Sequence, residues 1–107
     1  MISRAGSWLH GSMVLLAVLT VPVATAADRA ANAEGLADGC TSCHGIEGRS
    51  QGYIPSIAGL SKATLLRELK AYRAQTAQAT IMNRIARAYT DSELEALADY
   101  FSTRSRP

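Results

Sequence analysis

The feature that most constrains this chain is the pentapeptide Cys40-Thr41-Ser42-Cys43-His44. Two thiols three positions apart, followed at once by an imidazole, form the pattern that attaches a c-type haem. Residues three apart lie on one face of a helical turn, so both sulfurs can reach the two vinyl groups on one edge of the ring. The next residue, His44, is then delivered beneath the metal as its proximal ligand. The pattern therefore predicts one covalent haem c, with the rest of the chain folded around it.

Two other chemistries also use a C-x-x-C pair. A redox disulfide of the thioredoxin type is expected beside a βαβ pattern, whereas the periodicity of this sequence is helical. A zinc site needs about four ligands. Outside the leader described next, Cys40, Cys43 and His44 are the only Cys and His residues. Both alternatives are therefore less well supported than haem attachment.

The first 26 residues have the pattern of an export signal. A short basic start is followed by an apolar run from Met13 to Val23 and by Ala24-Thr25-Ala26, which has the form of a cleavage site. The apolar run is only about eleven residues long and contains Pro22, whereas a membrane-spanning helix needs about 20 apolar residues. We therefore expect a signal peptide over residues 1–26, cleaved near Ala26, and no membrane span in the mature chain.

The remaining residues, 27–107, are expected to form one domain that is small for an apolar core alone. The apolar core of a chain of about 80 residues rarely contributes more than about 3–5 kcal/mol, so a covalently held ring would complete it. One of the eleven basic residues, Arg4, belongs to the leader, which leaves ten basic residues against nine acidic ones. This near balance does not indicate a nucleic-acid partner.

Apolar periodicity predicts helices, and no strand pattern is long enough to build a sheet. The alanine-rich segment from Asp28 to about Gly39 is expected to be a short helix that Gly39 ends near the first cysteine. Ser61 can cap a second helix from Lys62 to about Gln75, with Leu65, Leu66, Leu69 and Tyr72 on its buried face. The charged residues of this helix are expected on its solvated face: Arg67, Glu68, Lys70 and Arg73. A fold of class all-α is therefore predicted, with three main helices.

The third main helix is the C-terminal one. Thr90-Asp91-Ser92-Glu93 has the form of a capping box and predicts a helix from Asp91 to about Thr103. Its apolar face should meet the first helix and the edge of the haem. The tail after it, residues 104–107, is expected to fray.

Residues 45–59 contain too many Gly and Pro residues for a helix and are expected to form a loop. The apolar members of this stretch, Ile54, Ile57 and the adjacent Leu60, would lie against the proximal face of the haem.

The sixth position on the iron decides between electron transfer and chemistry on a bound molecule. Met82 is the only methionine outside the leader, and no second histidine remains there to compete with it. Methionine readily fills cores, so an ordinary packing role for Met82 is the alternative. With Met82 bound, the iron would have no vacancy. Without it, a five-coordinate haem would bind or sense small ligands.

The order of these motifs resembles that of class I c-type cytochromes over the whole mature region. The resemblance rests on Cys40 to His44, Pro55-Ser56-Ile57-Ala58-Gly59-Leu60, Met82, and Leu97-Ala98-Asp99-Tyr100-Phe101. More narrowly, the stretch from Thr80 to Tyr89 and the helix ending in Tyr100-Phe101 are similar to the cytochrome subunit of flavocytochrome c sulfide dehydrogenase. Some members of that subunit family carry two haem domains, whereas this chain has one C-x-x-C-H motif.

The resemblance implies a small class I cytochrome c fold, a periplasmic location, and one-electron transfer by the haem. It implies that the backbone carbonyl of Pro55 accepts a hydrogen bond from His44 and that Ile57 and Leu60 belong to the haem environment. The candidates to pair with the haem propionates are Arg49, Tyr53, Arg84 and Tyr89.

The resemblance also implies a partner, namely an FAD-binding flavoprotein subunit that oxidises sulfide and passes electrons to this chain. No substrate catalysis is then expected in this chain itself, and the sequence does not identify the downstream acceptor. A free, diffusible monohaem carrier without a fixed partner remains the main alternative.

Overall fold

The structure, a computed structural model, describes Met1 and residues 19–78 and 81–107, and this part of the chain contains helices and no strand. The elements are α1 Ala26–Ala31, α2 Ala33–His44, η1 Ile46–Gly48, α3 Lys62–Arg73, α4 Met82–Ile85, η2 Ala86–Ala88 and α5 Asp91–Ser102. The α-helices α2, α3 and α5 have 12 residues each and dominate the domain. The predicted all-α class with three main helices is confirmed.

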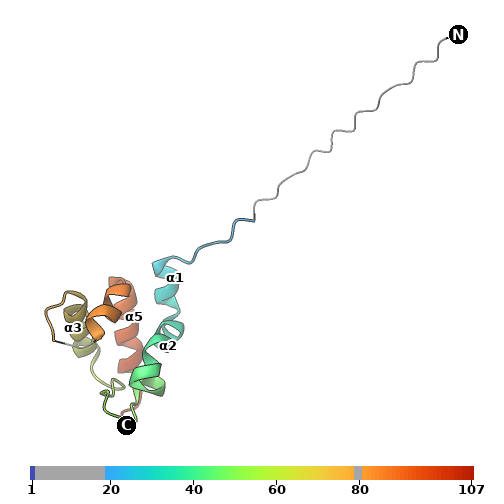
Figure 1. Ribbon diagram of the computed structural model, residues 1–107. Coiled ribbons are helices and arrows are strands. Elements are labelled where there is room, and N and C mark those ends of the chain that lie inside the picture. Colours follow the sequence, from blue (N-terminus) through green and yellow to red (C-terminus); the bar gives the residue numbers. More distant parts are fainter. Residues whose placement is uncertain (2–18, 79–80) are drawn as a thin grey trace.

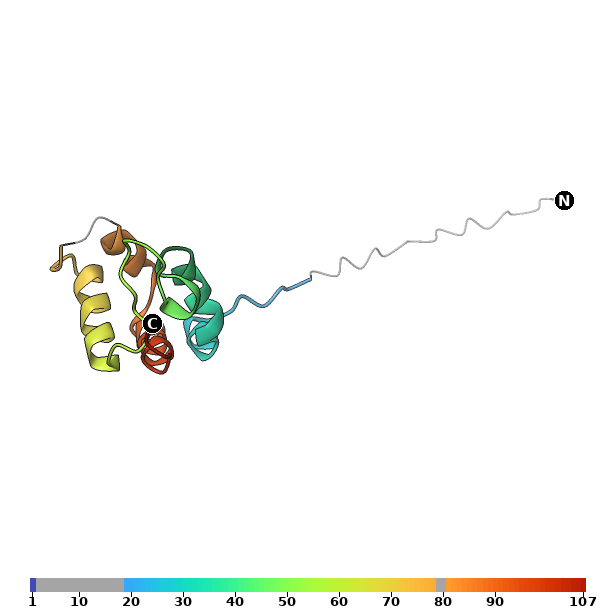
Figure 2. The ribbon, with the colours of Figure 1, turned by 90° about the horizontal axis from the view of Figure 1, so that it is seen from below.

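The C-terminal helix α5 lies at the centre, between α3 on one side and α1 and α2 on the other (Figure 1 and Figure 2). It begins with the predicted capping box: the Thr90 hydroxyl accepts from the Glu93 N–H at 3.3 Å, and the Glu93 carboxylate accepts from the Thr90 N–H at 2.8 Å. Its inward face carries Leu94, Leu97, Ala98 and Phe101, none more than 2% exposed. Removing these apolar side chains from water is the main force that packs the helices together.

The alanine-rich segment forms two helices rather than one. The chain breaks at Asn32, whose side-chain oxygen accepts from the Gly35 N–H at 3.1 Å and so caps α2. A Cβ at position 35 would lie 2.6 Å from Asn32 Nδ2, so the glycine leaves room for the Asn32 side chain to cap the helix. Local capping by Asn32 therefore outweighs the continuous alanine-rich pattern.

The prediction that Gly39 ends this helix is wrong, because α2 continues through both cysteines to His44. A Cβ at position 39 would lie 3.1 Å from the Tyr89 hydroxyl oxygen, so the glycine allows a close approach of a distant side chain. The helix ends at Gly45, which has a φ of 83°. A Cβ at this position would lie 1.9 Å from the carbonyl oxygen of Arg49, a backbone clash that only glycine avoids.

Helix α3 begins where the sequence predicts, because the Ser61 hydroxyl accepts from the Thr64 N–H at 3.1 Å. It ends at Arg73 rather than near Gln75. Gln75 has a φ of 60°, in the left-handed region, and a right-handed helix cannot continue through that conformation. The short elements α4 and η2 follow and lead into α5.

Residues 45–60, here called the proximal loop, run from the end of α2 to the start of α3 and pack against α5. The buried Gly48 has a φ of 82°, and its carbonyl accepts from the N–H groups of Ile57 at 2.8 Å and Ala58 at 3.1 Å. The Gly59 N–H donates to the carbonyl of Phe101 at 2.9 Å. Backbone hydrogen bonds therefore fix the loop to itself and to α5.

The tail after α5 makes two contacts with the rest of the domain, and the expectation that it frays stays a prediction. The guanidinium of Arg104 stacks 3.9 Å from the centroid of the Tyr100 ring, and Arg106 Nε donates to the carbonyl of Gly59 at 3.1 Å. The tail therefore contacts both α5 and the proximal loop.

The expected leader over residues 1–26 falls mainly on residues 2–18, which lie outside the described residues, and it stays a prediction. Residues 19–25 run away from the helices (Figure 1). Within the described segments, no helix has both the length and the apolar character needed to cross a membrane.

Candidate functional site

A largely apolar cavity of about 530 Å³ opens between α2, the proximal loop, α3, α4 and α5. Its lining residues are Gly39, Cys40, Cys43, His44, Tyr53, Ile54, Pro55, Ser56, Ile57, Leu60, Thr64, Leu65, Glu68, Leu69, Tyr72, Gln78, Ile81, Met82, Ile85, Leu97 and Phe101. Cavities of roughly 300–1,000 Å³ are typical for organic ligands and cofactors. This cavity is therefore large enough for a prosthetic group.

The last turn of α2 brings both thiols to one edge of the cavity. Cys40 is half-buried and Cys43 is exposed, and both are free thiols that line the cavity. Burial raises the pKa of the Cys40 thiol, and the neighbouring Cys43 is a smaller cause of the same shift. At a given pH, a thiol with a raised pKa has a smaller fraction of the reactive thiolate. The helix therefore presents two sulfurs side by side at the position where a ring could be attached.

His44 is buried and held in one orientation. Its Nδ1 lies 2.7 Å from the carbonyl oxygen of Pro55, the contact that the resemblance implied. Because a carbonyl only accepts, Nδ1 must carry the proton and donate, which leaves Nε2 as the nitrogen able to bind a metal. The proximal loop that carries Pro55 is itself fixed, since the Ser50 N–H donates to the Ser56 hydroxyl at 2.9 Å. This hydrogen bond thus fixes both the tautomer and the direction of the imidazole.

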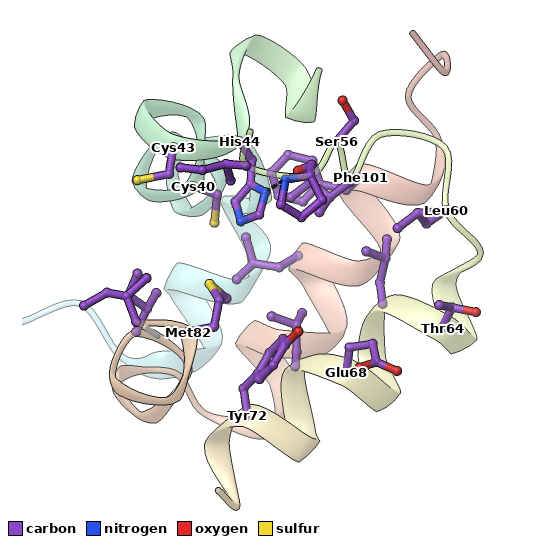
Figure 3. Close-up of a pocket in the computed structure, with 18 of the residues that line it drawn as sticks. Cys40, Cys43, His44, Ser56, Leu60, Thr64, Glu68, Tyr72, Met82 and Phe101 are labelled. Carbon is purple, nitrogen blue, oxygen red and sulfur yellow. Dashed lines mark hydrogen bonds between the residues drawn. The ribbon is translucent and has the colours of Figure 1, made fainter. Parts of the chain in front are cut away.

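Met82 lies across the cavity from His44. It is the first residue of α4 and is half-buried. Figure 3 shows the Met82 sulfur directed into the cavity between α4 and the end of α2. The His44 ring points into the same cavity from the α2 side. An imidazole nitrogen and a thioether sulfur therefore face the same space from opposite walls, a donor set that suits haem iron.

The other residues predicted for the site are distributed unevenly. Pro55, Ile57 and Leu60 all line the cavity. Among the candidates to pair with propionates, Tyr53 lines it, whereas Arg49 pairs with Glu47. The remaining two lie elsewhere in the described part of the chain: Tyr89 approaches Gly39 on α2, and Arg84 is an exposed residue of α4.

Sequence reasoning missed the contribution of α3 to the cavity. The residues of its buried face were assigned to the core, yet they also form a cavity wall. Glu68 was expected on the solvated face but lines the cavity, where its Oε1 accepts from Arg67 Nη2 at 3.0 Å. Thr64, Glu68 and Tyr72 are spaced by four residues and so share one helical face. That four-residue spacing was the feature of the sequence that could have predicted this cavity wall.

Comparison with known proteins agrees with this geometry. Residues 30–105 match the family model of cytochrome c. The chain is 36% identical over 67 residues to the cytochrome subunit of sulfide dehydrogenase from Chlorobaculum tepidum, covering 63% of this chain and 61% of that subunit. It is 30% identical over 97 residues to cytochrome c-553 from Nitratidesulfovibrio vulgaris, covering 82% of this chain and 95% of that protein.

A third relative has a different length. The thiosulfate dehydrogenase electron acceptor of Stutzerimonas stutzeri is 39% identical over 67 residues, which cover 59% of this chain and 31% of that protein. The chain thus spans less than two thirds of the length of two of these relatives.

The cavity fits the cofactor that this family carries. Its volume, its apolar walls and its two sulfurs on one edge suit a large apolar ring attached covalently, and the facing imidazole and thioether suit an iron at its centre. The family match also favours haem over the redox-disulfide and zinc interpretations of the same motif. The chain belongs to the cytochrome c family, as a class I c-type cytochrome with one covalently bound haem c, the cofactor of haem-based electron transfer.

Proposed function

We propose that this chain is a periplasmic one-electron carrier in which Cys40 and Cys43 hold the haem and His44 and Met82 bind its iron from opposite sides. The observation that carries this proposal is the placement of His44 and Met82 on facing walls of one apolar cavity, with both thiols at its edge. Two protein ligands leave no position for a substrate, so electrons are what the site can exchange.

The side chains around the site have separate tasks. When bound, the haem supplies an iron that changes between two oxidation states and so carries one electron. The Pro55 carbonyl orients His44 through the Nδ1 hydrogen bond and leaves Nε2 free to bind the metal. The Met82 thioether favours the reduced state and raises the reduction potential. The apolar walls from α3 and α5 exclude water from the metal and lower the local dielectric constant.

We further propose that the electron donor is an FAD-binding flavoprotein subunit of a sulfide dehydrogenase. The identity to the Chlorobaculum tepidum subunit supports this assignment, and the predicted export signal of this chain agrees with a periplasmic complex. Sulfide oxidation would then take place in the partner, and this chain would accept the electrons one at a time.

A free carrier is the second candidate, and one observation favours it. The match to cytochrome c-553 covers 95% of that protein, more than the 61% covered of the sulfide dehydrogenase subunit. Gel filtration of the native protein separates the two candidates. A flavin spectrum that elutes with the haem absorbance supports the subunit, whereas a particle of the mass of this chain alone supports the free carrier.

The axial ligands are tested by replacing Met82 with alanine. The oxidised wild-type protein should show the weak near-infrared band from sulfur to iron, and Met82→Ala should abolish it. Ile85→Ala is the matched control, because Ile85 lies on the same short helix and lines the same cavity. The control should keep the band. Absence of the band from the wild-type protein would instead indicate a five-coordinate haem or another ligand, and the proposed electron carrier would be wrong.

A further inference from the structure

The segment that carries Met82 has few contacts of its own to fix it. Residues 81–89, here called the distal segment, comprise α4, η2 and one residue on each side. Helix α4 has only four residues, and its N-cap, Ile81, makes no side-chain capping hydrogen bond. Isolated helices of this length are not stable in water. The position of Met82 must therefore be determined by contacts with other elements.

Arg73, the last residue of α3, makes such a contact at the opposite end of the segment. Its Nη1 donates to the carbonyl oxygen of Tyr89 at 3.2 Å, and its Nη2 donates to the carboxylate of Asp91. The hydrogen bond and charge of Arg73 lower the pKa of Asp91, so the carboxylate stays ionised. The planar guanidinium thus donates to two acceptors, the Tyr89 carbonyl and the Asp91 carboxylate, where the distal segment joins α5.

The side chain of Tyr89 adds a contact to a third helix. Its hydroxyl oxygen lies close to Gly39 of α2, so that a Cβ added at Gly39 would be only 3.1 Å from it. The Tyr89 side chain also packs against the hydrophobic core. Burial raises the pKa of Tyr89, and Cys40 and Glu93 are smaller causes. Tyr89 therefore lies where α2, α3 and α5 meet, close to the helix that bears the haem-binding cysteines.

We propose that Arg73 is a positioning residue for Met82, and that it keeps the Met82 sulfur over the metal by fixing the C-terminal end of the distal segment through Tyr89 and Asp91. This inference rests on the proposed role of Met82 as an iron ligand. Loss of the Arg73 contacts would let the segment move away from the cavity and would populate a state with an open iron position. An added ligand could then occupy that position.

The same helix provides a matched control. Arg67 also pairs with a carboxylate, but its partner is the adjacent Glu68, and both groups are substantially exposed. Arg67→Met removes an arginine and an ion pair from α3 without touching the distal segment. A second control, Ser61→Ala, removes the N-cap of α3 and lowers stability by about 1 kcal/mol at the other end of the helix.

The experiment measures imidazole binding to the oxidised holoprotein, since imidazole must displace Met82 to bind the iron. Apparent affinity for a site that is rarely open rises with the fraction of molecules in which it is open. Because Arg73 makes two charge-assisted hydrogen bonds, we expect Arg73→Met to raise imidazole affinity by about tenfold. The two controls, Arg67→Met and Ser61→Ala, should change it by less than about twofold. Arg73→Lys, which can reach only one acceptor, should lie between.

The outcomes separate this inference from the proposed ligation. If the wild-type protein shows the near-infrared band but Arg73→Met binds imidazole no better than wild type, Met82 is a ligand and Arg73 does not position it. An equal rise in Ser61→Ala would show that general loss of stability is the cause and would also overturn the inference. Should Arg73→Met not accumulate as holoprotein, Asp91→Asn removes the negative charge that pairs with Arg73, at an exposed position. It should raise the affinity by about threefold, again with the band intact at zero imidazole.

Discussion

The proximal loop holds one of the two proposed iron ligands, His44 at the end of α2, and the distal segment carries the other, Met82, but the two are held by different means. The proximal loop is fixed mainly by backbone groups: the Pro55 carbonyl holds His44, the Gly48 carbonyl accepts from two N–H groups, and Gly59 donates to Phe101. The distal segment packs against α3 with Ala86 buried, and its C-terminal end is held by the Arg73 side chain of α3. The position of His44 is therefore fixed by a backbone group of the adjacent loop, whereas that of Met82 depends on the assembly of helices.

This difference predicts where the site will loosen first. His44 is the last residue of the helix that carries both cysteines, so its position is set close to them in the chain. Met82 lies 38 positions further along the chain, and its contacts form only when α3 and α5 are in place. We expect moderate perturbations to release the thioether while the imidazole stays bound.

The largest expected effect is on the proximal side, at Gly45. Gly45→Ala places a Cβ 1.9 Å from the Arg49 carbonyl at a φ of 83°, so the loop must move. We expect the free energy of unfolding of the holoprotein to fall by about 3 kcal/mol, measured by chemical denaturation. Gly52→Ala is the control, because no atom lies within 4 Å of the added Cβ. Similar loss in both variants would contradict the view that backbone geometry fixes the proximal loop.

A smaller effect is expected from Glu93, which anchors the start of α5 beside the distal segment. It is 1% exposed, accepts from the Thr90 N–H, and pairs with Arg29 of α1 at 2.7 Å. These contacts, with the Thr90 backbone hydrogen bond the largest cause, lower the pKa of Glu93. Glu93→Gln should cost about 1 kcal/mol at pH 7, whereas the exposed Glu95→Gln should be nearly neutral.

The pH dependence of this effect has a definite sign. A lowered pKa in the folded state means that ionised Glu93 stabilises the protein above the ordinary glutamate pKa of about 4.3. That contribution is lost as pH falls through the lowered folded value. The difference in unfolding free energy between wild type and Glu93→Gln should therefore shrink as the pH is lowered below about 4. A difference that stays constant down to pH 2 would show that the charge of Glu93 is not its cause.

The smallest effect tests the distal side through Gly39. Alanine favours a helix over glycine by about 1 kcal/mol, but here its Cβ would crowd the Tyr89 hydroxyl at 3.1 Å. We expect Gly39→Ala to leave stability nearly unchanged and to raise imidazole affinity by about threefold, because the distal segment shifts. In a Tyr89→Phe background the hydroxyl is gone, and the same substitution should then have no effect on imidazole affinity. A rise of equal size in that background would exclude the contact with Tyr89 as the cause.

Sequence patterns predicted the parts of the fold whose causes are local. The capping box at Thr90 and the N-cap at Ser61 placed the starts of α5 and α3 correctly, because each depends on residues within three positions. The C-x-x-C-H motif predicted the cofactor for a similar reason, since its chemistry lies within five consecutive residues.

The errors concern contacts between distant segments. Gly39 has the usual identity of a residue that ends a helix, but its role is to admit the ring of Tyr89, 50 positions away in the sequence. Arg73 was expected to be a solvated charge, but its two acceptors are Tyr89 at the end of the distal segment and Asp91 at the start of α5. Neither partner can be identified from periodicity, because periodicity describes one helix at a time.

The position of α5 in the chain bears on how the cofactor is acquired. Leu97 and Phe101 of this last helix complete the cavity walls, and the tail that follows it contacts the proximal loop through Arg106. During synthesis the cysteine pair therefore emerges before the helix that completes the cavity. Until α5 docks, the thiols remain accessible to an incoming ring and to any machinery that delivers it, and folding then encloses the finished product.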